Sequence, residues 1–181
     1  MDKRIASTIE HIERINKVLR AIRDINQLIT RTTDRADLIA QTCDALVETE
    51  IYDNALIVLL GPDGSVEHTA QAGSDGLLRQ MTSCPTQHSL PMRVQQALHI
   101  DGMSIAKETR EDYEAQPPRS PEMDRAIAST ALRHGDTQYG VLSVTLAPSF
   151  PEDAEAIASL KEIAVDIALA LNNLETQKSL A

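Results

Sequence analysis

Residues 125–174 constrain the fold of this chain more than any other stretch. Residues 126–133 and 138–146 are short runs rich in aliphatic and hydroxyl side chains, and four turn residues separate them. This pattern predicts a β-hairpin. A proline-containing break follows, and apolar residues then recur at helical spacing over residues 152–178. A hairpin that leads into a long amphipathic helix forms most of a small domain core in one continuous piece.

A second hairpin is predicted earlier in the chain. Residues 52–60 are apolar at most positions, which favours a central strand that is buried on both faces. Gly61 to Gly64 (GPDG) predict a turn, since proline presets φ and glycine accepts positive φ. Residues 65–72 then return as the partner strand. Between the two hairpins, residues 82–125 are irregular, with a short helix and a short strand, and a long segment of this kind commonly covers a site.

The first 31 residues predict one long helix with apolar residues at heptad spacing. Two interpretations are open: the helix pairs with a second copy of the chain, or it packs only on its own domain. A polar seam residue usually sets register and partner number, and Asn26 occupies such a position. The C-terminal helix carries a similar seam. The residues expected to mediate dimerisation are Ile5, Ile12, Ile15, Leu19, Ile22, Asn26, Ile29, Leu171 and Leu174.

These elements predict an α+β domain organised as two parts. Residues 1–31 are an N-terminal signalling or dimerisation helix, and residues 32–181 are the domain itself, ending in a long helix. Asp34 is the expected N-cap of a second helix. Cys43 lies on the apolar face of that helix, where a small buried hydrophobe is the usual role of cysteine.

Composition and charge exclude several functions. The net charge is −10, and nucleic acid is a poor partner because phosphate contacts need a basic surface. Only one Phe and three Tyr are present, without Trp, so a pocket would lack the aromatic walls that flat ligands usually use. No apolar run is long enough to span a membrane, and two cysteines form no disulfide framework. We therefore expect a cytoplasmic protein without membrane insertion.

Candidate ligand contacts lie on the last strand. Strand alternation predicts that Leu142 and its even-numbered neighbours face the helices, so that Ser143 and Thr145 face the irregular segment. Two hydroxyls beneath a cover can hydrogen-bond a small polar ligand, or they can line a half-wet sheet face. Thr130 is the expected neighbour from the preceding strand, with Ser129 as the alternative if the parity differs.

The irregular segment carries three further candidates: Cys84, His88 and Tyr113. A thiolate and an imidazole can ligate a metal or haem, or act as a nucleophile and its base. Two ligands leave a metal site incomplete, and the sequence requires no cofactor. Tyr113 is the only aromatic residue of the segment and can close over a ligand or anchor the loop.

The order of these elements resembles that of the GAF domain family, over residues 15–175. The motifs that carry the resemblance are residues 18–26 (VLRAIRDIN), 56–64 (LIVLLGPDG), 70–73 (AQAG), 85–86 (PT), 140–144 (GVLSV) and 150–155 (FPEDAE). The chain is most similar to GAF domains of bacterial sensor proteins, beside PAS, histidine-kinase or diguanylate-cyclase modules. The resemblance implies an antiparallel sheet with the first, second and last helices on one face, and ligands beneath the irregular segment on the other.

This resemblance implies a non-enzymatic regulatory domain of a signal-transduction protein, for example in a two-component system. We expect it to bind a small polar ligand, to form a homodimer through its terminal helices, or both, and to act on an output domain of the same protein. A purely structural dimerisation module is the alternative. Bilin-binding members carry His directly after the chromophore cysteine, whereas Pro85 follows Cys84 here. The cyclic-nucleotide signature is absent, and members that reduce free methionine sulfoxide need several active-site cysteines.

Overall fold

The computed structural model describes residues 2–73, 92–107, 126–147 and 154–181. Its helices are α1 (Asp2–Arg31), α2 (Arg35–Glu48), α4 (Met92–His99) and α5 (Ala154–Leu180). Its strands are β1 (Tyr52–Leu60), β2 (Val66–Gly73), β3 (Met103–Lys107), β4 (Ala126–His134) and β5 (Thr137–Leu146). The two predicted hairpins are thus β1–β2 and β4–β5, and the predicted short helix and strand between them are α4 and β3.

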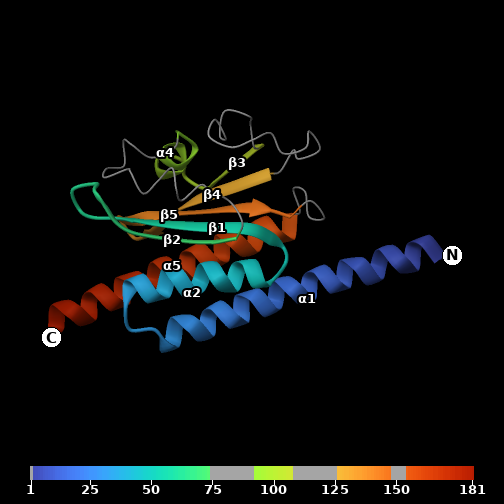
Figure 1. The fold of residues 1–181 in the computed structure, drawn as a ribbon, viewed down its shortest axis with the longest axis horizontal. Helices are drawn as coiled ribbons and strands as arrows, with labels where there is room; N and C mark the ends of the chain where they lie inside the picture. Colours follow the sequence, from blue (N-terminus) through green and yellow to red (C-terminus); the bar gives the residue numbers. More distant parts are fainter. Residues whose placement is uncertain (1, 74–91, 108–125, 148–153) are drawn as a thin grey trace.

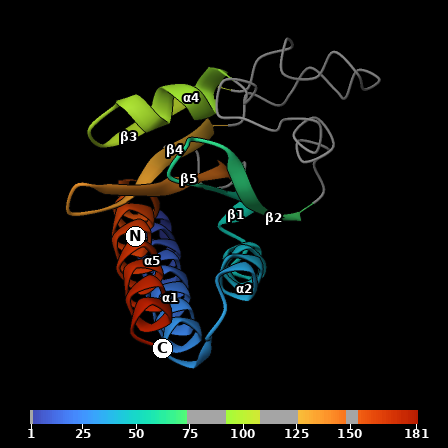
Figure 2. The same cartoon turned by 90° about the vertical axis from the view of Figure 1, so that its left-hand side faces the viewer.

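One antiparallel sheet organises the domain, with the strand order β2-β1-β5-β4-β3. The first and last hairpins therefore meet through β1 and β5 at the centre of the sheet. Helices α1, α2 and α5 lie on one side of the sheet and α4 on the other (Figures 1 and 2). The predicted α+β architecture, with the first, second and last helices on one face, is confirmed.

The main core lies between the sheet and the helices α2 and α5. Alternate residues of β1 and β5 face it, among them Ile57, Leu142 and Val144, and they pack with Leu46 of α2 and Leu160 of α5. The remaining residues of these strands face the opposite way, because strand side chains alternate between the two faces. The sequence of β1 is apolar on both faces because each face is covered, as predicted for a central strand.

Helix α1 forms the outermost part of the helical layer. It packs against α5 and α2 and runs in the same direction as α5 (Figure 1). Ala21 and Ile25 are its buried residues, and Val18, Ile22 and Ile29 pack against the main core. Asp34 caps α2 as predicted, because its carboxylate accepts hydrogen bonds from the amides of Ala36 and Asp37.

Two tyrosines attach α5 to the sheet. The hydroxyl of Tyr52, on β1, donates to the Ala156 carbonyl oxygen at 2.8 Å, and lies 3.2 Å from the Ser159 hydroxyl. The hydroxyl of Tyr139, on β5, donates to the Asn172 side-chain oxygen at 3.0 Å. Both phenol rings are buried, so the polar tip of each ring reaches a partner on the helix while its body fills the aliphatic core.

Candidate functional site

The sheet face that lies away from α1, α2 and α5 has a polar part. The strand register places Asn54 opposite Thr145, and Ser143 opposite Ser129. Ser104 of β3 is opposite Ser129 in turn. Residues that are directly opposite in an antiparallel pair share one face. The register therefore gathers amide and hydroxyl groups from four neighbouring strands on one surface.

These polar side chains are buried in spite of their chemistry. Ser129 is 2% exposed and Ser143 is 4% exposed, and their hydroxyl oxygens lie 2.8 Å apart. Asn54 and Thr145 are also buried. A serine hydroxyl has one donor and two acceptor positions, so this hydrogen bond leaves further capacity at both serines. We define Asn54, Ser129, Ser143 and Thr145 as the polar cluster.

The adjoining part of the same sheet face is apolar and lies beneath α4. Val94, Ala97 and Leu98 of α4 pack against a second core cluster that includes Val58 and Val141. Val141 and Ser143 are two residues apart on β5 and share this face. The face therefore changes from apolar to polar along a single strand, which is the composition expected of a surface for a small amphiphilic or polar molecule.

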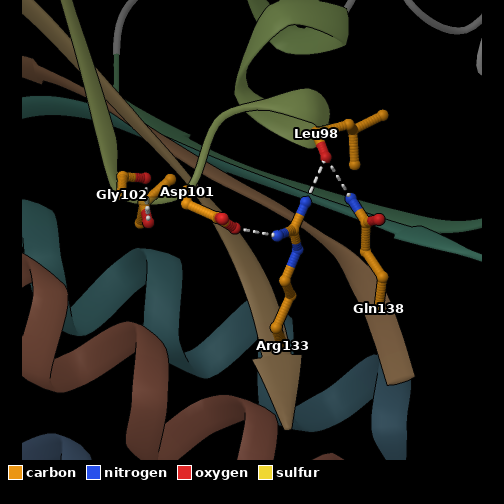
Figure 3. Close-up of polar contacts among 6 residues, drawn as sticks. Leu98, Asp101, Gly102, Arg133 and Gln138 are labelled. Carbon is orange, nitrogen blue, oxygen red and sulfur yellow. Dashed lines mark hydrogen bonds and ion pairs between the residues drawn. The ribbon is translucent and has the colours of Figure 1, made fainter. Parts of the chain in front are cut away.

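Polar contacts hold the end of α4 on the sheet (Figure 3). The guanidinium of Arg133, on β4, donates to the Leu98 carbonyl oxygen and to the Asp101 carboxylate, the latter at 2.7 Å. The side-chain amide of Gln138, on β5, donates to the same Leu98 oxygen at 3.1 Å. Basic side chains commonly satisfy the last carbonyls of a helix in this way. The β4–β5 hairpin thus fixes the position of α4 relative to the polar cluster.

The structure places Ser143 and Thr145 on the predicted face, but it corrects the assignment of Thr130. Thr130 is opposite Leu142, so it faces the helical layer, and its hydroxyl donates to the Gly102 carbonyl oxygen at 3.2 Å. Ser129 occupies the expected place beside Ser143 because its parity is the opposite one. The other three candidates, Cys84, His88 and Tyr113, lie outside the described residues.

Sequence reasoning missed Asn54 and Ser104. Asn54 lies in a strongly apolar strand, and a polar side chain at such a position could have indicated a site residue. Its proximity to Thr145 depends on the pairing of β1 with β5, which joins residues far apart in the chain and follows from no local pattern. Ser104 depends in the same way on the pairing of β3 with β4.

The predicted dimerisation residues divide into two groups. Leu171 and Leu174 belong to the main core, Ile22 and Ile29 pack against it, and Ile15 is half-buried. Leu171, Leu174, Ile22 and Ile29 thus contribute to packing within the chain, while the dimerisation role of all nine residues stays a prediction. Ile5, Ile12, Leu19 and Asn26 are exposed. The physical reason is that α1 has two apolar rows, and its own domain covers only one of them.

Cys43 is a structural thiol. It is fully buried on α2, and its thiol donates a weak hydrogen bond to the Ala70 carbonyl oxygen at 3.6 Å. Burial, reinforced by the neighbouring Asp44 carboxylate, raises the pKa of Cys43 to about 12. The nucleophilic form of cysteine is the thiolate, so Cys43 is unreactive in the folded domain. Within the described ranges, no group of three or more His, Cys, Asp or Glu residues is placed to hold a metal ion.

This raised pKa predicts a loss of stability in alkali. The folded-state pKa of Cys43 lies above its ordinary value of 9.0, so its contribution is complete below pH 9 and declines as the pH rises towards 12. We expect the free energy of unfolding to fall by about 1.4 kcal/mol per pH unit in this window. Urea unfolding between pH 8 and pH 10.5 measures this slope. The Cys43→Ala variant should lack the part of this pH dependence that comes from the thiol. If the free energy of unfolding fell equally with pH in both proteins, the assignment to Cys43 would be contradicted.

No family model matches the sequence, and no curated protein matches it. Solved structures do. The GAF domain of a proposed sensor histidine kinase from Pseudomonas syringae pv. tomato matches with a TM-score of 0.64 and 18% identity, covering 96% of this chain and 99% of that one. The GAF domain of a phosphoenolpyruvate-protein phosphotransferase from Coxiella burnetii matches with a TM-score of 0.65 and 14% identity, covering 90% and 97%.

A third match is an enzyme. Free methionine-R-sulfoxide reductase from Neisseria meningitidis, in complex with its substrate, has a TM-score of 0.62 and 15% identity, covering 88% of this chain and 91% of that chain. Together with the geometry above, these likenesses define an α+β domain built on one antiparallel sheet. Its fold is that of a GAF domain, as the sequence predicted. The described residues contain no helix that is both long and apolar enough to cross a membrane.

Proposed function

We propose that this chain is a regulatory sensory domain that binds a small polar molecule at the polar cluster. The observation that carries the proposal is the burial of Asn54, Ser129, Ser143 and Thr145 on the sheet face opposite the terminal helices. Hydroxyl and amide groups donate and accept hydrogen bonds without carrying charge. They suit a ligand that itself bears hydroxyl, amide or carboxyl groups, such as a small metabolite acid.

The second part of the proposal is a relay through the terminal helices. Leu142 and Val144 alternate with Ser143 and Thr145 on β5 and belong to the core that contains α5. A ligand that changes the position of β5 therefore acts on the packing of α5 directly. We propose that α1 and α5 mediate a homodimer and transmit this change to an output domain of the same full-length protein. A histidine-kinase or other two-component output is one such arrangement.

Binding is tested by thermal-shift screening of small carboxylates, amides and polyols, followed by calorimetry of any ligand found. Thr145→Val preserves the shape of the side chain and removes its hydroxyl. Because one hydrogen bond is worth about 1 kcal/mol, we expect binding to weaken about fivefold or more. The matched control is Thr176→Val, whose hydroxyl is exposed on α5 and donates within the helix.

A screen in which no compound shifts the unfolding temperature would contradict ligand binding. The second candidate function, a structural dimerisation module, would then be favoured. It is supported by a specific observation, since Ile5, Ile9, Ile12 and Leu19 are exposed on α1. A thiol-dependent enzyme or a metal or haem sensor would depend on Cys84 and His88. Loss of a measured turnover in a Cys84→Ser variant would establish the enzymatic alternative.

A further inference from the structure

The β4–β5 hairpin contains a β-bulge close to its turn. Leu132 is opposite Gly140, but the next residue of β4, Arg133, is opposite Gln138. Tyr139 is therefore an extra residue on β5. An extra residue of this kind changes the face of the sheet to which the side chains beyond it point. The bulge thus decides what the side chains at the tip of this hairpin can contact.

The bulge reverses the faces of Gln138 and Tyr139. Val141 packs beneath α4, so strict alternation would direct Tyr139 towards α4 and Gln138 towards the helical layer. The contacts have the opposite arrangement. The Gln138 amide donates to the Leu98 carbonyl oxygen of α4 at 3.1 Å, whereas Tyr139 belongs to the main core on the other face. Two consecutive residues therefore hold elements on opposite faces of the sheet.

On the α4 side, the hairpin tip supplies two donors to one carbonyl oxygen. Arg133, opposite Gln138, also donates to the Leu98 oxygen and binds the Asp101 carboxylate (Figure 3). A backbone carbonyl oxygen has two lone pairs and can accept both hydrogen bonds. The same helix packs on Val141, which is two residues from the polar cluster on β5. A shift of α4 on this surface therefore pulls on the tip of the hairpin.

On the other side, Tyr139 contacts two helical elements. Its hydroxyl donates to the Asn172 side-chain oxygen of α5 at 3.0 Å. Its ring centroid lies 5.8 Å from the guanidinium carbon of Arg35, within the range of a cation–π interaction. Arg35 is the first residue of α2 and follows the connection from α1, and it forms an ion pair with Glu67 of β2 at 3.6 Å. That connection and the C-terminal end of α5 lie at the same end of the domain (Figure 1).

We propose that Gln138 and Tyr139 form a two-sided clamp, through which a displacement of α4 reaches the C-terminal half of α5 and the connection between α1 and α2. The clamp rests on the relay proposed above and gives it a specific path. One planar peptide unit joins the two residues, so a backbone shift at Gln138 carries Tyr139 with it. The effect arrives at Asn172, and the Ala156 contact near the start of α5, which Tyr52 makes, is left unchanged.

Amide hydrogen exchange, measured residue by residue without any ligand, tests the clamp. A release variant combines Arg133→Met with Gln138→Met, which removes both donors to the Leu98 oxygen and keeps unbranched side chains. We expect the amides of α4 to exchange at least about tenfold faster. Amides 172–176 of α5 should exchange about fivefold faster, the effect of losing one hydrogen bond. Amides 158–162 of the same helix should not change.

Two further variants separate release from transmission. Asp136→Asn is the matched control, because Asp136 is exposed in the same turn, and it should change neither helix. Tyr139→Phe removes the hydroxyl that binds Asn172 and should speed exchange of amides 172–176 by about the same fivefold factor. Adding the release substitutions to Tyr139→Phe should then speed exchange in α4 without a further increase at 172–176. Urea unfolding checks that each variant is folded.

The outcomes separate the clamp from the proposed function. Faster exchange in α4 with no change at 172–176 overturns the clamp and leaves ligand binding in place. An equal increase at 158–162 and 172–176 also overturns it, because α5 would then loosen as a whole. So does a further increase at 172–176 when release is added to Tyr139→Phe. A thermal-shift screen that finds no ligand contradicts the proposed function, whereas the exchange results on the free protein remain valid.

Discussion

Replacing Gly140 with alanine is expected to destabilise the domain by about 3 kcal/mol or more, at the upper end for overpacking of a core. Gly140 lies on β5 opposite Leu59 of β1, and the two central strands approach closely there. A Cβ atom at this position would overlap the carbonyl oxygen of Val58, and would lie 3.0 Å from the Leu59 Cα. Since these neighbours are backbone atoms of a central strand, relief would require movement of the sheet.

Urea unfolding of the purified domain measures this loss. Gly135→Ala is the matched control, because Gly135 has a φ of +58° in the β4–β5 turn, and a Cβ there meets nothing within 4 Å. Its cost should be limited to the left-handed backbone conformation, about 1–2 kcal/mol. Total stabilities are roughly 5–15 kcal/mol, so the Gly140 variant can lose much of its folded population. Equal losses in the two variants would show that the close approach is not the cause.

Replacing Leu142 with alanine is expected to cost about 3–4 kcal/mol. Leu142 is fully buried at the centre of the sheet, where its cross-strand partners are Ile57 and Thr130. Truncation removes buried apolar surface and leaves a cavity between the sheet and the helices, which the surrounding strands cannot easily fill. Thermal and urea unfolding should both report the loss.

Leu169→Ala serves as the comparison for this variant. Leu169 lies on α5 and is exposed, so its truncation should change the free energy of unfolding by less than about 1 kcal/mol. Leu142→Ala should also weaken any ligand effect on α5, because it loosens the contact between β5 and the helical layer. A Leu142 variant as stable as the Leu169 variant would contradict the assignment of Leu142 to the core.

Local patterns predicted the elements of the fold well. The alternation in residues 138–146 assigned Leu142 and Ser143 to opposite faces, and the structure agrees. The prolines and glycines placed the breaks, and Asp34 marked the start of α2. Each of these signals depends only on residues close together in the sequence, so it can be recognised without knowing which distant segments pair.

Contacts between distant segments were harder to predict. Thr130 and Ser129 differ by one residue, and only the register of β4 against β5 decides which of them joins Ser143. Asn54 and Thr145 are 91 residues apart in the sequence, and only the pairing of β1 with β5 brings them together. The seam of α1 posed the same problem, because heptad spacing identifies apolar rows without showing which row the domain covers. In the structure, Ile22 packs against the main core, whereas Leu19 is exposed to solvent.

The two tyrosine contacts with α5 restrict how that helix can move. Tyr52 holds the helix at Ala156 and Tyr139 holds it at Asn172. These points are sixteen residues apart, or about 24 Å along the axis. Sliding the helix along its axis would stretch both hydrogen bonds at once, whereas a small change of its tilt leaves each phenol within reach. A change in sheet twist would therefore alter the tilt of α5 more readily than its position along the axis.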